Sequence, residues 1–374
     1  MRFYLAMGAA AAALIATPAF AQTPPPADAP PAAAPPAAAK SWKDLITIEG
    51  LADAYGSFRP GGSATVPATF RVFDAPVDTF TLAFAKLAVG VKPEPVGMRL
   101  DLGFGPVADL TASNIPPGAA TNEVWKHILQ AYASFAIGGT TPLTLDVGKF
   151  VTAAGAEVIE AHANWNYSRS FLFGYAIPFT HTGLRLTAPL SSALTLQIML
   201  ANGWDNAVDN NAGKTLGVSA TFVAPFGTTF IANFLAGPEP QMGAGNPWRI
   251  LFDAVVSHTV GKLSLNANFD YGHQNDFNWW GLAAYLRMAV TSALNLSVRG
   301  ELFQDNEGFR LGTGTKTTVE EITGTLGFPM GNNAELRAEA RADFSGSNVF
   351  VYDLMPPNAK KYQFTLTGAA LVWF

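Results

Sequence analysis

Charged side chains recur at every second position in several segments of the chain, a spacing that suits the binding of ions or polar solutes along one surface. In 334–344, for example, Glu335, Arg337 and Glu339 alternate with apolar residues. A strand points successive side chains to opposite faces, so each such segment would carry one charged face and one apolar face. Rings of charge can select ions by sign, although the same residues could instead only pair across neighbouring strands. The charges that strand parity places on this face are Arg99, Asp101, Asp146, Arg185, Arg249, Asp253, Arg299, Glu301, Glu335, Arg337, Glu339 and Arg341.

No motif for catalysis or metal binding is recognisable in the sequence. None of the five histidines lies in a G-x-S-x-G nucleophile motif or an H-E-x-x-H metal motif, and the chain has no Cys. The net charge of −5 gives no basic face for nucleic acid. We therefore expect a protein that is not an enzyme, with no metal, no cofactor and no nucleic-acid partner. A Ser-His hydrolase built on a barrel is the less favoured alternative.

The alternation predicts β-strands, because a helix would group its apolar residues three and four apart. The expected fold class is all-β, a closed antiparallel up-and-down transmembrane β-barrel of about sixteen strands in which short turns alternate with long loops. A soluble β-sandwich also alternates, but strands of about ten residues and this loop pattern disfavour it. Strands are expected near 45–55, 78–90, 96–105, 126–137, 142–151, 173–188, 193–202, 214–224, 227–235, 248–259, 261–271, 278–290, 293–303, 316–328, 332–343 and 361–374.

The chain is divided by its composition into three parts. Residues 1–21 are predicted to be a cleaved signal peptide, because Arg2 precedes a short apolar stretch and Ala19-Phe20-Ala21 forms a small-x-small cleavage site. Residues 22–44 are rich in Pro and Ala and are expected to be an extended periplasmic linker. Residues 45–374 form the barrel. Charged residues are only 14% of the chain, against about 25% in soluble domains, yet no later stretch has the ~18 apolar residues of a membrane helix.

Aromatic residues mark the C-terminus and several strand ends. Phe374 completes an alternating apolar row, and a terminal aromatic resembles the signal by which the last strand of outer-membrane barrels contacts the barrel-assembly machinery. Aromatic side chains at strand ends are expected to form girdles at the membrane interfaces. The candidates are Tyr55, Trp204, Trp248, Tyr271, Trp279, Trp280 and Tyr362.

The middle third of the chain carries motifs that resemble the OmpL-like family of β-barrel porins. The residues that carry the resemblance are Asn164, Trp165, Asn166, Tyr167, Ser168, Arg169 and Ser170, followed by Tyr175, Pro178, His181 and Gly183. It implies a porin-like barrel in the outer membrane of a Gram-negative-type bacterium, surrounded by outer-membrane lipid and lipopolysaccharide. Sixteen-stranded porins also imply a homotrimer, although the sequence shows no apolar wall for that contact. Residues 164–170 could instead be a structural latch that holds a loop to the barrel.

A barrel of about sixteen strands is too wide for its own side chains to fill, so a loop is needed to narrow it. The loop 152–172 is the candidate, with Glu157, Glu160, His162 and Arg169 at the pore constriction and a short helix within 155–163. The resemblance implies that this third loop folds into the lumen. The expected function is passive diffusion of small hydrophilic solutes or ions, and the alternative is a non-conducting structural or adhesive barrel.

Overall fold

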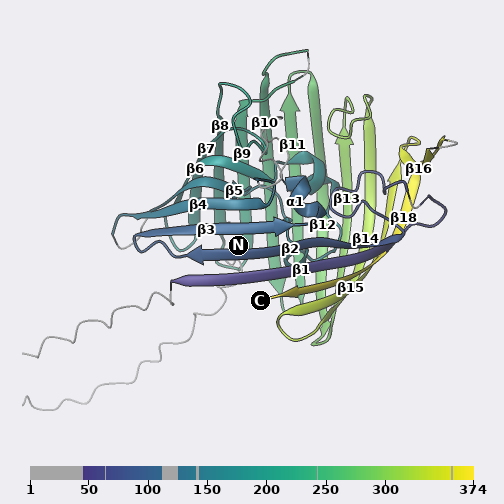
Figure 1. Cartoon of the computed structure of the whole chain (residues 1–374), viewed down its shortest axis with the longest axis horizontal. Helices are drawn as coiled ribbons and strands as arrows, with labels where there is room; N and C mark the ends of the chain where they lie inside the picture. Colours follow the sequence, from purple (N-terminus) through teal and green to yellow (C-terminus); the bar gives the residue numbers. More distant parts are fainter. Residues whose placement is uncertain (1–44, 64, 112–124, 140–142, 242, 355–356) are drawn as a thin grey trace, which may run out of the picture. The chain divides into compact units, whose positions relative to one another are not determined.

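Sixteen strands form one closed antiparallel barrel, in which β1 is hydrogen-bonded to both β2 and β18 (Figure 1). The computed structural model describes residues 45–374 except 64, 112–124, 140–142, 242 and 355–356, so the predicted signal peptide and linker lie outside the described residues. The up-and-down barrel predicted from the sequence is confirmed. Its strands are β1 (Ile46–Phe58), β2 (Thr79–Val91), β3 (Val96–Phe104), β4 (Ile128–Ile137), β5 (Leu143–Val151), β6 (Thr180–Pro189), β7 (Leu194–Ala201), β8 (Thr215–Val223), β9 (Thr229–Pro238), β10 (Trp248–Val260), β11 (Leu263–Gln274), β12 (Phe277–Thr291), β13 (Leu294–Asp305), β14 (Thr317–Pro329), β15 (Ala334–Ser345) and β18 (Tyr362–Trp373).

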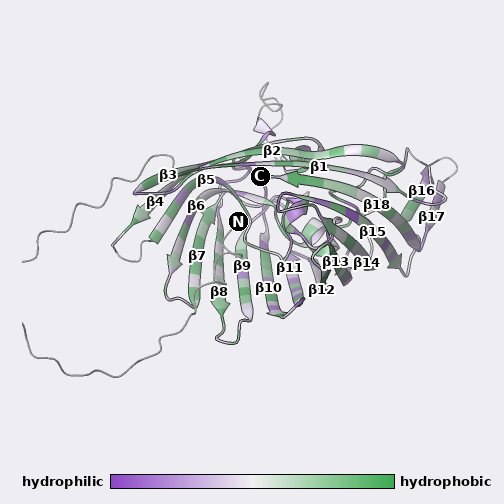
Figure 2. Cartoon of the chain, turned by 90° about the horizontal axis from the view of Figure 1, so that it is seen from below, coloured by the Kyte–Doolittle hydropathy of each residue, from purple (hydrophilic) through white to green (hydrophobic). Residues whose placement is uncertain are grey.

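The two faces of the barrel wall differ in chemistry. On β15, Leu336 is 46% exposed whereas its neighbour Arg337 is 4% exposed, and the same alternation gives the strands their bands of hydrophobic and hydrophilic colour in Figure 2. Since the barrel is closed, we call the face with the exposed apolar rows the outer face and the opposite one the inner face. No helix among the described residues is long and apolar enough to cross a membrane.

The connections alternate in length with one exception. The turns that follow β2, β4, β6, β8, β10, β12 and β14 are short, whereas most connections at the other end are long. The exception is 275–276, which joins β11 to β12 with two residues. Two long connections contain elements that the sequence did not reveal, the helix α1 (Pro106–Thr111) and the small hairpin β16 (Phe350–Leu354) and β17 (Pro357–Lys360).

A β-bulge in β2 changes which of its side chains point to the inner face and which to the outer face. Strict alternation would put Lys86 on the same face as Phe80, Leu82 and Phe84. The register between β1 and β2 shifts at Asp53/Ala54, so Phe80 and Leu82 are exposed at 94% and 60% while Phe84 is buried. Lys86 therefore lies on the inner face, where it contacts carboxylates. An extra residue in one strand is what strand parity cannot detect.

Three further predictions are wrong in detail. The sixth strand begins at Thr180 and not at 173, because Leu172–Ala176 forms a π-helical turn. The helix expected within 155–163 is only the single 3₁₀ turn Ala161–Ala163. Of the proposed girdle residues, Tyr55, Trp204 and Trp279 are buried, whereas Trp248, Tyr271 and Tyr362 are exposed on the outer face.

Candidate functional site

The third loop, 152–179 between β5 and β6, is hydrogen-bonded to carboxylates on the inner face. Glu339 on β15 accepts the backbone N–H groups of Tyr167 at 2.6 Å and Ser168 at 3.0 Å. Glu301 on β13 accepts those of Phe171 at 2.7 Å and Leu172 at 2.6 Å. Each carboxylate therefore satisfies two backbone donors that would otherwise be buried without a partner.

Arginines on the same strands bind the carbonyl oxygens of this loop. Arg299 on β13 donates to the Ser168 carbonyl at 2.6 Å, and Arg341 on β15 donates to the Arg169 carbonyl at 2.6 Å. Arg337 donates to the carbonyls of Ala161 and Asn166. On the wall, Glu side chains thus accept from the N–H groups of the irregular loop backbone, and the Arg side chains that alternate with them donate to its carbonyl oxygens. The charges of β13 and β15 have structural partners, so they are not freely presented to a solute.

Two of the predicted constriction acids bind wall cations. Glu157 accepts from Arg299 at 2.7 Å and also from the amide and hydroxyl of Ser170. Glu160 forms an ion pair with Lys86. Burial alone would raise the pKa of the Glu160 carboxyl, but the charge and hydrogen bond of Lys86 outweigh burial and lower this pKa to about 2.

The other two predicted constriction residues have different surroundings. Arg169 is buried and donates to the carbonyls of Tyr167, Val158 and Ile159 within its own loop. His162 is half-buried, with its ring 5.2 Å from that of Trp373. Arg169 thus stabilises the shape of the loop itself. The assignment of these four residues to the narrowest point of a pore stays a prediction.

The family motif contributes most of the contacts that fix the third loop. Asn164 closes a turn through the backbone of Val158, Asn166 donates to Thr325 on β14, and the Tyr167 hydroxyl donates to Asp53 on β1. Trp165 is half-buried, with its ring edge-on to Tyr285. These are the contacts expected of a latch, the alternative interpretation of 164–170.

The second half of the motif lies where the loop enters β6. The Tyr175 carbonyl accepts from Arg310, and Pro178 is buried. His181 has one ring nitrogen 3.1 Å from the Gly203 carbonyl. A Cβ atom at Gly183 would lie 2.1 Å from the Leu200 carbonyl oxygen, so only glycine permits this approach of β6 and β7.

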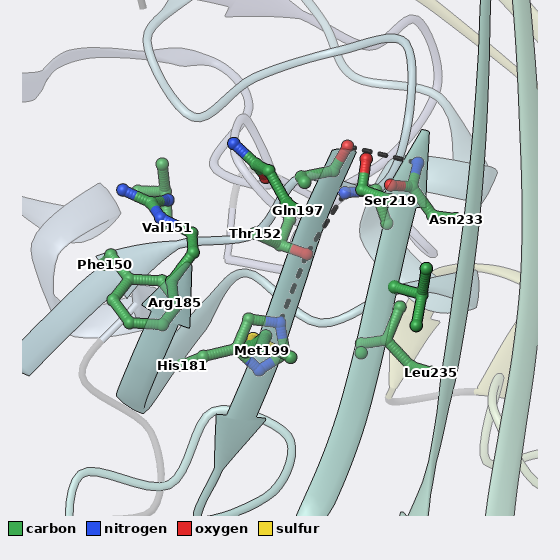
Figure 3. A pocket seen from close by; sticks show the side chains of 14 residues that line it. Phe150, Val151, Thr152, His181, Arg185, Gln197, Met199, Ser219, Asn233 and Leu235 are labelled. Atoms are coloured by element: carbon green, nitrogen blue, oxygen red, sulfur yellow. Dashed lines mark hydrogen bonds between the residues drawn. The ribbon is translucent and has the colours of Figure 1, made fainter. Parts of the chain in front are cut away.

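A small cavity of about 30 Å³ lies between the start of the third loop and β6 to β9 (Figure 3). The figure shows Thr152 bonded to His181, and Asn233 bonded to the loop through the Ala153 carbonyl. The other polar side chains that line it are Arg185, Gln197 and Ser219. Because uncharged groups predominate, this side of the inner face differs from the charged wall of β13 to β15.

The remaining predicted charges are buried or half-buried on the inner face, and several pair with one another. Arg185 on β6 bonds Asp146 on β5 at 2.8 Å. Arg99 on β3 bonds both Glu49 and Asp101. Arg249 donates to Gln274, and Asp253 accepts from Asn233 and Asn268. Pairing across strands, the less functional interpretation, thus describes many of these contacts, while their role as pore-lining charges stays a prediction.

Sequence reasoning missed several residues of this site. Glu321 binds Arg299 on the inner face, and strand parity alone would have found it. Asp343, which the alternation in 334–344 does place on the charged face, binds Arg341. The buried pair Arg71 and Asp74 in the first loop also contacts the barrel, since Arg71 donates to Thr365 on β18. No sequence signal marks that contact. Among the described residues there is no group of three or more His, Cys, Asp or Glu side chains that could hold a metal ion.

Comparisons with known proteins agree with this architecture. The family model described as "Putative beta-barrel porin-2, OmpL-like" matches residues 45–374. No curated protein matches the chain in sequence.

Solved structures resemble the chain in fold at low identity. An anion-selective porin from Comamonas acidovorans has a TM-score of 0.58 at 8% identity, covering 88% of this chain and 99% of that one. The trimer form of OmpT, an outer membrane protein of Vibrio cholerae, has 0.57 at 10%, covering 88% and 99%. OprB of Pseudomonas putida has 0.55 at 11%, covering 89% and 95%. At such identities these likenesses show a shared barrel fold alone.

Proposed function

Because this chain belongs to the OmpL-like family of β-barrel porins, we propose that it is a channel for the passive diffusion of small hydrophilic solutes or ions across the outer membrane. The observation that carries the proposal is the closed barrel with exposed apolar rows outside and polar side chains inside. Such a wall is stable with lipid around it and water or polar groups within it. The neighbours of known structure, porins among them, support the same localisation.

We further propose that the third loop narrows the lumen. Its support is the set of bonds to the loop backbone from Glu301 and Arg299 on β13 and from Glu339, Arg337 and Arg341 on β15, the two strands that flank β14. The loop also bonds Asp53 on β1, Lys86 on β2 and Asn233 on β9. We therefore propose that any passage runs along β6 to β8, where the inner face is mostly uncharged and part of the cavity of Figure 3 lies.

Planar-bilayer recording of the purified protein tests the channel function. We expect stepwise conductance increments, together with exclusion of neutral sugars above a size limit. Replacing Glu157, Glu160 and Arg169 by Ala, one at a time, should alter conductance or ion preference, because each holds the third loop in shape or to the wall. Unchanged currents in all three variants would remove these residues from the constriction.

A non-conducting structural barrel is the second candidate, and one observation favours it. The inner-face charges of β13 to β15 are almost completely buried by the third loop, so a plugged barrel would show the same contacts. A flat current baseline from protein that is folded in the bilayer would support this candidate. An enzyme has less support, since the family and the neighbours indicate a channel.

The partners proposed for this channel follow from its place in the membrane. Small solutes or ions would pass through it, lipid and lipopolysaccharide would cover its outer face, and the last strand with Phe374 would contact the barrel-assembly machinery. A homotrimer is proposed by analogy with the trimer form of OmpT. Cross-linking of the protein in native outer membranes tests that state, and a single monomer band would count against it.

A further inference from the structure

The arginines on the inner face of the barrel strands all have hydrogen-bond partners except Arg287 on β12. The other six donate to carboxylates, to the Gln274 side chain or to loop carbonyls, and they are Arg99, Arg185, Arg249, Arg299, Arg337 and Arg341. Arg287 is half-buried and makes no hydrogen bond, ion pair or ring contact with any other residue that the structure describes. Its guanidinium therefore keeps all five N–H donors available.

The two residues that pair directly with Arg287 are uncharged. Ser264 on β11 and Ser297 on β13 lie directly opposite it in the two adjacent strands. Asn266 and Asn295 occupy two of the diagonal positions, within reach of a long side chain, and the other diagonal position on β13 is Arg299, which is bonded to Glu321. No carboxylate stands at any of these positions, in contrast to the surroundings of Arg99, Arg185 or Arg341.

The amide side chains beside Arg287 are also uncommitted. Neither Asn266 nor Asn295 donates a hydrogen bond to another described residue, so the amide N–H groups of both are available. The acid with an electrostatic effect on Arg287 is Glu335 on β15. Its carboxylate is already bonded to Arg337 at 2.6 Å. A free guanidinium with amide and hydroxyl groups around it offers donors for an oxyanion from several directions.

The location of Arg287 gives a solute access to it. The residue lies four positions before Thr291, the end of β12, and thus close to the short-turn end of the barrel. The third loop contacts β12 through Trp279, which donates to the Ala176 carbonyl, and through Tyr285, whose ring is edge-on to Trp165. Neither contact involves Arg287 itself. Ser264, Asn266 and Asn295 are half-buried like Arg287, whereas Ser297 and the next inner-face residue of β13, Arg299, are buried.

We propose that Arg287, with Asn266 and Asn295, forms a binding site for a small oxyanion, either a carboxylate or a phosphate. The proposal rests on the channel function proposed above, because the anion reaches the site through the barrel. The planar guanidinium would bind two oxygens of the anion side by side, and the amides would donate to the remaining oxygens. The site makes the channel prefer small organic or inorganic oxyanions over chloride, which lacks this geometry.

Single-channel recording with acetate, phosphate and chloride as alternative anions tests the site. Wild-type protein should show acetate or phosphate currents that saturate at lower concentration than chloride currents. Arg287→Gln should weaken this apparent affinity by roughly three- to tenfold, the net range of one ordinary hydrogen bond in a hydrated site. Lys92→Gln is the charge-matched control, because Lys92 is an exposed residue of the β2–β3 turn at the same end, and it should retain the wild-type saturation.

Comparison of acetate with phosphate shows which of the two oxyanions the site binds. A loss confined to acetate identifies a carboxylate site, and a loss confined to phosphate identifies a phosphate site. Equal saturation for all three anions in wild-type protein, or equal effects of Arg287→Gln and Lys92→Gln, would overturn the proposal while leaving the channel function intact.

A binding measurement that needs no conduction covers the case of a silent channel. In detergent-solubilised protein, saturation-transfer-difference NMR should detect acetate methyl protons, and phosphorus line widths should broaden with inorganic phosphate. Arg287→Gln should reduce either signal by about the same factor, with Lys92→Gln unchanged. A flat bilayer baseline with intact binding would refute the channel and keep the site, whereas absence of binding to wild-type protein would refute the site.

Discussion

Removal of Glu301 and Glu339 should release the third loop from the barrel wall. In the Glu301→Ala/Glu339→Ala variant, four backbone N–H groups lose their acceptors, those of Tyr167, Ser168 and the next pair, Phe171 and Leu172. These N–H groups are buried, so water cannot take the place of the lost carboxylates as hydrogen-bond acceptor unless the loop rearranges.

The expected magnitude follows from the number of donors that are left unsatisfied. A buried donor without a partner costs about 1–3 kcal/mol, so each single replacement should destabilise the bound loop by about 2–6 kcal/mol before water enters. Even the lower value shifts the ratio of detached to bound loop by about thirtyfold. The double variant should roughly square that factor if the two sites act independently.

Single-channel recording and limited proteolysis can measure this release together. We expect larger or noisier conductance steps and faster cleavage within 152–179, whereas the heat-modifiable migration of the barrel in SDS gels should stay near that of wild-type protein because the sheet is intact. Asp146→Ala is the control. It removes an inner-face acid whose partners, Ser134 and Arg185, are both on the wall.

A double variant with unchanged conductance and unchanged protease resistance would refute the assignment of the loop as a wall-anchored constriction. If Asp146→Ala produced the same changes, the effect would arise from lost negative charge and not from a detached loop.

Three further predictions concern other parts of the molecule. Glu160→Gln should shorten open-state lifetimes or add current noise at neutral pH, because Lys86 loses its ion-pair partner in the third loop. Lys86→Gln should give a similar current trace. A quiet trace like that of wild-type protein from both variants would contradict this prediction. Burial raises the pKa of Glu239, in the loop after β9, to about 7, so that loop should lose stability as pH rises from about 4.5 through 7. The protection factor of the Trp204 amide, which donates to Glu239, measures this as the exchange rate relative to the intrinsic rate at the same pH, and it should fall over this range in wild-type protein but not in Glu239→Gln. Leu282→Arg on the outer face should destabilise the folded barrel by about 2–4 kcal/mol in urea titrations from lipid vesicles, since it places a charge in hydrocarbon. Thr221→Arg on the inner face, opposite the uncharged Thr195 and Ile231, should cost much less.

The barrel was predictable from the sequence because its physics is local. Alternation of Glu335, Arg337 and Glu339 with apolar residues is a property of consecutive positions, and it indicates the two faces without knowledge of any partner strand. The lengths of the connections likewise follow from the spacing of the alternating segments. Lys86 marks the limit of this reasoning, since the bulge in β2 reverses the parity at that residue.

For the site, the sequence predicted which residues of the third loop are polar but not which residues of the wall they bind. The acids and arginines of the third loop indicated that it carries polar interactions, but its partners on the wall lie far away in the chain, 74 residues for Glu160 with Lys86 and 142 for Glu157 with Arg299. Glu339, for example, bonds the amides of Tyr167 and Ser168. Arg287 was missed because β12 carries apolar residues on both faces near Ala283, which hides the alternation. Arg287 stands out only because no carboxylate pairs with it in the two adjacent strands, and the register of those strands cannot be read from the sequence.

The orientation of the wall is the claim on which the channel depends, and single-cysteine labelling tests it directly because the chain contains no native Cys. Leu366→Cys and Thr367→Cys on β18 are adjacent residues that are exposed on the outer face and buried on the inner face, respectively. With an environment-sensitive fluorophore on each, brominated acyl chains should quench the label at 366 strongly and the label at 367 weakly. Equal quenching at the two positions, or stronger quenching at 367, would contradict a barrel whose apolar rows face lipid.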